Sequence, residues 1–152
     1  MVLQTVAGHR IGEDAEDLKA WMSGLSGCPA VTHTLQTACG SDKHGDSPAT
    51  WFYVEGDPHN GIARRRCLSC GEVAHLLDSA DHWNYPAMWC CKGCQQSIAE
   101  VAIGVHAELA TDGQPRVSWL AVGVRCVECG RFDGVTDMLV DSLTLDDVAN
   151  GV

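Results

Sequence analysis

Three pairs of cysteines in this sequence share one spacing, with two residues between the members of each pair. The pairs are Cys67 with Cys70, Cys91 with Cys94, and Cys126 with Cys129. A two-residue gap lets both sulfur atoms of a pair face one point, which suits a metal ion held by thiolates. Three pairs at the same gap therefore predict metal binding rather than a scatter of reduced core thiols.

Two of the pairs extend into a longer shared motif. Residues 66–71 read RCLSCG and residues 125–130 read RCVECG. The glycine after the second cysteine permits the positive φ angle that a tight turn around a metal ion requires. The shared motif suggests a duplicated metal-binding turn, and we refer to each CxxC pair with its turn as a knuckle.

A structural zinc site takes four tetrahedral thiolate or imidazole ligands, so one knuckle supplies half a site. Twenty residues separate Cys70 from Cys91, at the upper edge of the spacing at which two CxxC pairs commonly share an ion. This spacing predicts a first site formed by Cys67, Cys70, Cys91 and Cys94.

The last knuckle, Cys126 with Cys129, then needs two further ligands. Cys28 and Cys39 are the remaining candidates and would join the N-terminal part to this knuckle. A second interpretation pairs the two RCxxCG knuckles and leaves the middle knuckle to bind with Cys28 and Cys39 or with a histidine. His33 and His44 flank Cys39 and are the first candidates for that histidine, whereas Cys90 has no assigned role in either pairing.

The spacing of the first two knuckles resembles that of the zinc-ribbon and treble-clef fold groups, over roughly residues 62–110. The resemblance implies a metal-stabilised module that most often holds other macromolecules. We expect one or two Zn²⁺ ions per chain. Because all-sulfur tetrahedral sites also hold iron or iron–sulfur clusters, an iron-binding redox protein remains an alternative.

The elements around the knuckles indicate a β-rich α+β fold of zinc-ribbon-like hairpins with a short N-terminal helix. Residues 13–23 are expected to form the helix. Acidic residues stand in its first turns, and apolar residues recur at helical spacing after them. Residues 31–37 and 50–55 are rich in β-branched and aromatic side chains and are expected to be strands. We divide the chain into an N-terminal segment, 1–60, that packs on a knuckle domain, 61–152.

The apolar residues of segment 98–109 fit both the period of an α-helix and the alternation of a β-strand. Its apolar residues satisfy a helical face, but they also alternate, and Asp112 with Gly113 would turn the chain into a second segment of similar length. The β-branched residues and Gly104 weaken a helix. A β-hairpin is therefore favoured, narrowly.

The composition and charge of the chain exclude several classes of function. The chain has 152 residues, nine cysteines and a formal net charge of −10, whereas proteins that bind duplex DNA usually carry a basic stripe. Neither a secretory leader nor an apolar run long enough to span a membrane is evident. We expect a cytoplasmic protein without membrane contact, where thiols stay reduced and serve as metal ligands more often than as disulfides.

Part of the sequence matches a pattern found in one class of zinc enzymes. Zinc-dependent nucleobase deaminases combine H-x-E with a later P-C-x-x-C, and the chain has His106 and Glu108 ahead of Cys126 and Cys129. Arg125 stands where the pattern has proline, and the two parts are close together in sequence. A deaminase is therefore a minor alternative, and we expect no catalytic activity.

A single basic cluster, residues 64–66, precedes the first knuckle, and Trp83, Tyr85 and Trp89 follow it. Arginines beside aromatic residues can bind single-stranded nucleic acid. The surrounding acidity argues against that alternative. The sequence favours a zinc-binding accessory or assembly module with a protein partner.

Overall fold

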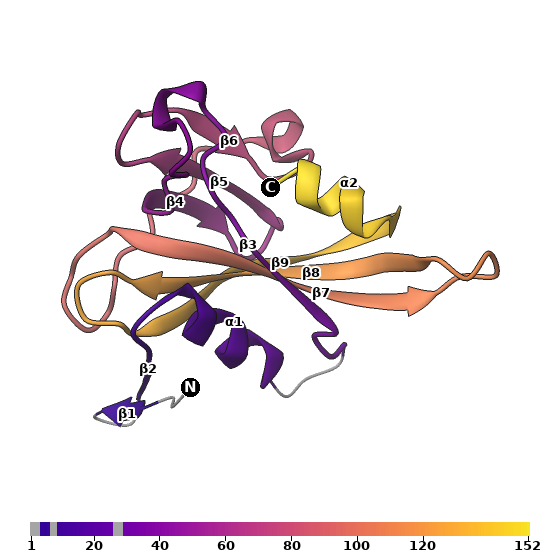
Figure 1. The fold of residues 1–152 in the computed structure, drawn as a ribbon, viewed down its shortest axis with the longest axis horizontal. Helices are drawn as coiled ribbons and strands as arrows, with labels where there is room; N and C mark the ends of the chain where they lie inside the picture. The colour runs from indigo at the N-terminus through magenta and orange to yellow at the C-terminus, as the bar shows by residue number, and fades with distance from the viewer. Residues whose placement is uncertain (1–3, 7–8, 26–28) are drawn as a thin grey trace.

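The computed structural model describes residues 4–6, 9–25 and 29–152. Most of the strands belong to one antiparallel sheet, and a helix lies on each side of its long strands (Figure 1). The strands are β1 (Gln4–Val6), β2 (His9–Ile11), β3 (His33–Gln36), β4 (Phe52–Asp57), β5 (Ile62–Cys67), β6 (Val73–His75), β7 (Ala99–Leu109), β8 (Pro115–Cys126) and β9 (Phe132–Leu143). The helices are α1 (Ala15–Ser23) and α2 (Leu145–Asn150), with 3-10 turns η1 (Asp42–His44) and η2 (Ser79–His82).

The large sheet has seven strands in the order β6-β5-β4-β7-β8-β9, and β3 pairs with β7 beside this path. Its strands come from both sides of residue 60, and β4 and β5 form a hairpin across that point. The long strands β7, β8 and β9 form the centre of the molecule, with β4, β5 and β6 over one face (Figure 1). The expectation of a β-rich α+β fold with a short N-terminal helix is confirmed.

The segment whose period was ambiguous is strand β7. It pairs with β8 through a turn at Gly113, whose φ is +80°. Gly104 faces α1, where an added Cβ would lie 3.1 Å from the Met22 side chain. The hairpin prediction is correct, and Gly104 allows the close approach of the helix to the sheet.

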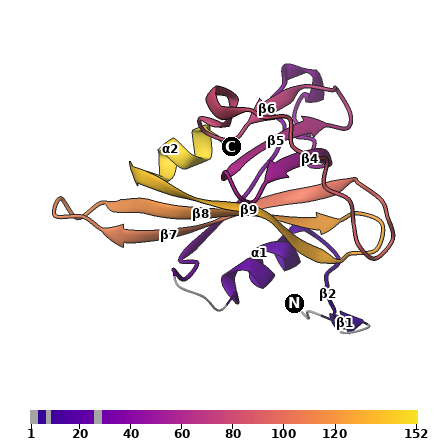
Figure 2. The ribbon, with the colours of Figure 1, turned by 180° about the vertical axis from the view of Figure 1, so that it is seen from behind.

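Each face of the central strands is covered differently. On one face, Val101, Ile103 and Leu120 lie in the main core with α2, and on the other face α1 packs through Leu18 and Met22. Figures 1 and 2 place the two helices on opposite sides of these strands. No helix among the described residues is both long and apolar enough to cross a membrane.

Helix α1 ends at Ser23, as expected, but begins at Ala15, two residues after the expected start at Glu13. Asp14 is the N-cap, and its side chain accepts a hydrogen bond from the backbone N–H of Asp17 at 3.0 Å. The backbone N–H of Gly24 closes the last turn. Trp21 stacks on Phe132 of β9 with ring centroids 5.3 Å apart, which ties the helix to the far strand of the sheet.

Candidate metal centres

Among the described residues, cysteine and histidine side chains gather into two groups of four, and within each group all ligand atoms lie within 4.8 Å of one another. We call these groups centre 1 and centre 2. Centre 1 consists of Cys39, His44, Cys67 and Cys70, and centre 2 consists of Cys91, Cys94, Cys126 and Cys129.

Both expected pairings of the knuckles are wrong. The first two knuckles, which are neighbours in sequence, belong to different centres, and so do the two RCxxCG knuckles. Cys39 lies in centre 1 and not beside the last knuckle, whereas Cys28 lies outside the described residues. His44, one of the two histidines considered as a substitute for a cysteine ligand, completes centre 1, and His33 belongs to neither group.

The topology of the sheet explains the observed pairing. In each hairpin the end of the second strand lies beside the start of the first strand, because the strands are antiparallel. Cys67 ends β5, and Cys126 ends β8. Their partners precede the first strands of the same hairpins, β4 and β7. Each centre therefore closes its own hairpin.

The separations between ligand atoms fit a tetrahedral ion. In centre 2, Sγ of Cys91 lies 3.5 Å from Sγ of Cys129, and Sγ of Cys94 lies 3.4 Å from Sγ of Cys126. A zinc–sulfur bond of about 2.3 Å gives a tetrahedral edge of about 3.8 Å. A disulfide would bring two sulfurs to about 2.05 Å. The four thiols are thus spaced for a shared ion and not for cross-linking.

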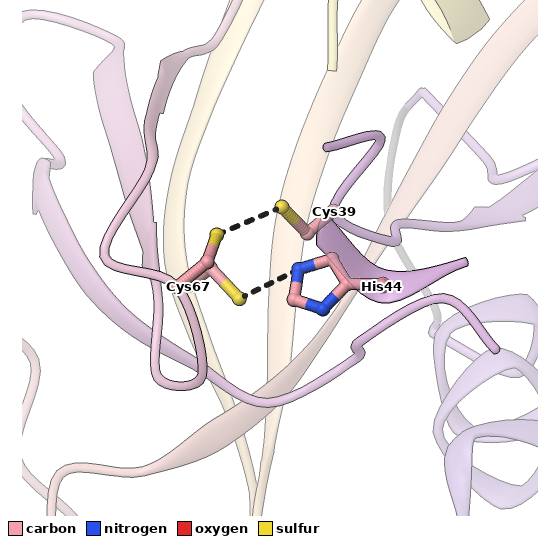
Figure 3. A group of neighbouring side chains, drawn as sticks. Cys39, His44 and Cys67 are labelled. Carbon is pink, nitrogen blue, oxygen red and sulfur yellow. Dashed lines mark hydrogen bonds between the residues drawn. The ribbon is translucent and has the colours of Figure 1, made fainter. Parts of the chain in front are cut away.

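Centre 1 has matching dimensions with one imidazole. Figure 3 shows Cys39 and His44, from one loop before β4, pointing toward Cys67 at the end of β5. Sγ of Cys67 lies 3.5 Å from Nε2 of His44, and Sγ of Cys39 lies 3.7 Å from Sγ of Cys70. Zinc–nitrogen and zinc–sulfur bonds of about 2.0 and 2.3 Å give a mixed edge of roughly 3.5 Å. The residues of both centres fit a tetrahedral ion.

The loop that supplies Cys39 and His44 is held at both ends. The backbone N–H of Cys39 donates to the carbonyl oxygen of Ala49 at 2.8 Å, which closes the loop between them. His44 ends the short turn η1, which begins at the N-cap Ser41. The hydrogen bond at Cys39 and the turn that contains His44 hold a thiol and an imidazole beside the knuckle of Cys67 and Cys70.

All three knuckles share one backbone pattern. In each, the first cysteine receives a hydrogen bond at its carbonyl oxygen from the residue four positions later. Its own N–H donates to the carbonyl oxygen five positions later. The six bonds are 2.8–2.9 Å long, and the pairs are Cys67 with Gly71 and Glu72, Cys91 with Gln95 and Gln96, and Cys126 with Gly130 and Arg131.

The residue four positions after the first cysteine has a positive φ in every knuckle: +77° at Gly71, +66° at Gln95 and +78° at Gly130. Two of these positions are glycines, as the RCxxCG motif predicts. The third is a glutamine, so the RCxxCG motif marks only two of the three knuckles that share this backbone. The shared geometry identifies the middle knuckle as a third copy of the same turn.

The thiols of centre 2 have divergent acidities. Burial opposes ionisation of Cys91, but hydrogen bonds from the backbone N–H groups of Cys94 and Gly93, together with those from the thiols of Cys129 and Cys126, lower the pKa of Cys91 to about 7. Burial raises the pKa of Cys126 to about 12 and also raises the pKa of Cys129. The turn thus favours one thiolate, and the charge of a bound cation would favour the others.

Centre 1 shows the same contrast. Burial disfavours the thiolate of Cys67, yet hydrogen bonds from the backbone of Cys70 and Ser69, together with those from the thiols of Cys70 and Cys39, lower its pKa overall. Burial raises the pKa of Cys39. In both centres the first cysteine of one knuckle is the thiol that the backbone prepares for ionisation.

The ligand sets are mostly buried. Cys67, Cys91 and Cys126 are at most 1% exposed, whereas Cys129 is exposed. Four protein ligands fill a tetrahedral shell and leave no position for a substrate or water, which is characteristic of structural zinc sites. Cys90 belongs to neither centre, and its thiol donates to the carbonyl oxygen of Gln95 at 3.3 Å.

The deaminase pattern is not assembled. Cys126 pairs in register with Ala99 at the start of β7, whereas His106 pairs with Trp119 toward its other end. Seven residues along a strand span roughly 23 Å. Nδ1 of His106 lies 2.8 Å from the carbonyl oxygen of Ala30, and its Nε2 lies 3.1 Å from Glu108. This pair forms a surface contact away from both centres.

The basic cluster is largely engaged within the protein. Arg64 donates two hydrogen bonds to Glu55, at 2.9 and 3.1 Å, and lies 4.3 Å from the ring centroid of Trp83. Arg65 donates to the carbonyl oxygen of Ala38 at 3.0 Å. Arg66 alone of the three is exposed. The cluster therefore offers much less cationic surface than the sequence suggests.

Comparisons with known protein families, with curated proteins and with solved structures find no match for this chain. Its two groups of four ligands are thus interpreted from their own geometry. The signal that identifies His44 is positional: a pair of ligands precedes each hairpin, and Cys39 with His44 stands before the first hairpin as Cys91 with Cys94 stands before the second.

Proposed function

We propose that this chain is a zinc-binding protein whose two centres are structural, and that it acts as a non-catalytic interaction or assembly module. The observation that carries the proposal is the presence of two complete sets of four ligands, each closing a β-hairpin. Each hairpin with its ligands forms a zinc-ribbon-like unit. Pairing between β4 and β7 joins the two units into one sheet.

Zinc is the ion that best suits both centres. A set of three thiolates and one imidazole, as in centre 1, is a common structural zinc site, and so is the all-cysteine set of centre 2. Centre 2 also suits iron, because four thiolates at tetrahedral spacing hold either metal. An iron-binding redox role is therefore the second candidate, limited to centre 2.

A binding role, rather than a catalytic one, follows from the coordination and the surface. Complete ligand sets leave the ions no open position for a substrate. Large apolar side chains are exposed on the surface. Trp51, 47% exposed, lies beside the first knuckle, where its carbonyl oxygen accepts a hydrogen bond from the N–H of Leu68 at 3.0 Å, and Tyr85, outside the knuckles, is 81% exposed. Aromatic side chains on rigid loops are the usual anchors of protein interfaces. The net charge of −10 and the internal use of Arg64 and Arg65 favour a protein partner over nucleic acid.

Native mass spectrometry with elemental analysis of the reduced, full-length chain tests the proposal. We expect two zinc ions per chain and no absorption in the visible region. Iron at one ion per chain with visible absorption would favour the redox candidate. A folded protein that binds no metal when purified with zinc would refute the proposal. In a separate activity assay, release of ammonia from a nucleobase would favour the deaminase alternative.

A further inference from the structure

One face of the central sheet is only half covered. Helix α1 packs on β7 and β8, where the Met22 side chain approaches Gly123 so closely that an added Cβ would lie 2.7 Å from it. On β9 the situation is the opposite, because a Cβ added at Gly134 meets nothing within 4 Å. Leu139, on the same strand, is 84% exposed. Within the described part of the chain, the outer portion of this face has no helix over it.

A groove runs along this open part, between α1 and strands β8 and β9, and has a volume of about 290 Å³. Trp21 and Leu25 form the wall on the helix side, and Trp119 stands on the sheet side. Ala121 and Gly134 contribute to the floor. Large apolar walls above a floor of small residues allow close approach of another backbone.

The dimensions suit an α-helix. Two neighbouring strands occupy about 10 Å across the sheet, which is close to the diameter of an α-helix with its side chains. Leu139 pairs in register with Trp119, so both side chains lie on the face that α1 occupies. The open strip thus offers the same kind of surface that α1 already uses, one helix width away.

The charges around the groove select a cationic occupant. Strand β9 contains three aspartates and no lysine or arginine. Asp133 accepts a hydrogen bond from Nε1 of Trp89, a residue of the main core on the other face, so the charge at the groove itself is that of Asp137. Asp137 lines the groove, and its carboxylate accepts a hydrogen bond from Nε1 of Trp119 at 2.9 Å. On α1, Lys19 is paired with Glu16 at 2.7 Å. The described lining includes no basic side chain, and the whole chain is strongly acidic.

We propose that this groove binds an amphipathic helix of a partner protein, with apolar residues on one face and lysine or arginine along its flanks. The helix lies beside α1 over β8 and β9, and its basic residues face Asp137 and the neighbouring acidic side chains. This inference rests on the proposed role as an interaction module and names the surface that performs it. A second copy of the chain is disfavoured as the occupant, because two copies each carry a net charge of −10.

The test uses the metal-loaded chain and a synthetic amphipathic helix of leucine and lysine, with a leucine and glutamate peptide of the same length as control. Binding is followed by tryptophan fluorescence and calorimetry. Gly134→Leu places an apolar side chain in the groove, from a position where an added Cβ meets nothing within 4 Å, and should weaken binding at least tenfold. Ser118→Val, at an exposed position of β8 outside the groove lining, should leave binding unchanged. Asp137→Asn should weaken binding roughly threefold, the effect of a rim charge.

Leu139→Lys provides a second variant, since its side chain is almost fully exposed and the substitution leaves the core intact. This substitution should weaken the binding of the cationic peptide at least tenfold. Equal binding of both peptides, or binding unaffected by Gly134→Leu and Leu139→Lys, would overturn the inference, as would a dimer that Gly134→Leu dissociates. Metal content is measured for every variant. Two zinc ions with no peptide binding would reject the groove alone, whereas a folded chain without zinc would reject the proposed metal-binding function.

Discussion

Cys67 and Cys126, the first cysteines of the two RCxxCG knuckles, lie on one row across the sheet. Cys67 pairs in register with Phe52, Phe52 with Ala99, and Ala99 with Cys126. Three strand spacings, about 14 Å measured along the sheet, lie between the two cysteines. Both centres therefore lie at the same end of the sheet, and they share no ligand.

Because the centres share no ligand, each should lose its ion independently. Cys94→Ser should reduce the metal content from two ions per chain to one and lower the free energy of unfolding by more than about 4 kcal/mol, as loss of a metal site does. Metal analysis combined with chemical denaturation checks both values. Cys90→Ser is the matched control and should change neither. Loss of both ions from Cys94→Ser would show that the centres are coupled.

The knuckles and the hairpin of β7 and β8 could be predicted from the sequence, because both are encoded locally. A CxxC pair needs only its own turn, and alternating residues around Asp112 and Gly113 need only each other. The short helix α1 is local in the same sense, since an N-cap residue and one apolar face define it. These predictions are confirmed by the structure.

The pairing of ligands could not be predicted in this way, because the fold brings together residues that are distant in sequence. The gap between Cys70 and Cys91 has a typical length for one site, but it separates two hairpins that each bind their own ligands. His44 joins Cys67 from 23 positions away. Only the antiparallel register, which spacing does not contain, decides which ligands meet.

Gly130→Ala should cost more stability than Gly71→Ala, although both glycines occupy the same position of a knuckle. At Gly71 an added Cβ meets nothing within 4 Å, so the cost is the left-handed backbone alone, about 1–2 kcal/mol. At Gly130 the Cβ would lie 2.5 Å from the carbonyl oxygen of Gly12. Chemical denaturation of the metal-loaded variants measures the difference, and equal costs would contradict the contact with Gly12.

Gln95→Gly should stabilise the middle knuckle. Gln95 has a φ of +66°, which costs a residue with a side chain about 1–2 kcal/mol, whereas the added entropy of glycine in the unfolded chain offsets about 0.5–1 kcal/mol. The free energy of unfolding should therefore rise by roughly 0.5–1 kcal/mol with metal content unchanged. Gln96→Gly, outside the left-handed region, is the control and should be destabilising. A loss of stability in Gln95→Gly would argue that the side chain has a role of its own.

Glu100 should make the protein less stable as the pH rises. It lies buried beside Arg125, with Nη1 of Arg125 3.2 Å from Oε1, while Oε2 has no hydrogen-bond partner within the described ranges of the chain. Burial raises the pKa of Glu100, and the attraction of Arg125 offsets this only in part. The folded state therefore holds the proton more tightly than the unfolded state. The stability that this proton provides is complete below the ordinary glutamate pKa and disappears as the pH rises through the raised value.

Comparing Glu100→Gln with the unmodified chain isolates this contribution, because protonation of the thiolates affects both proteins equally. The stability of the variant relative to the unmodified chain should increase as the pH rises from about 4.5 toward neutrality. Denaturation curves at several pH values, with metal content verified at each, measure that difference. A difference that stays constant with pH would mean that Glu100 titrates normally.

Arg65→Ala should destabilise the protein, whereas Arg66→Ala, its neighbour in the basic cluster, should not. The Arg65 guanidinium donates to the carbonyl oxygens of Ala38 and Val152, at 3.0 and 3.2 Å, and lies 4.5 Å from the ring centroid of Phe52. Loss of these charged hydrogen bonds should cost about 2–3 kcal/mol. Arg66 is exposed, so its removal should change stability by less than about 0.5 kcal/mol. Equal effects of the two substitutions in thermal and chemical unfolding would contradict the structural role of Arg65.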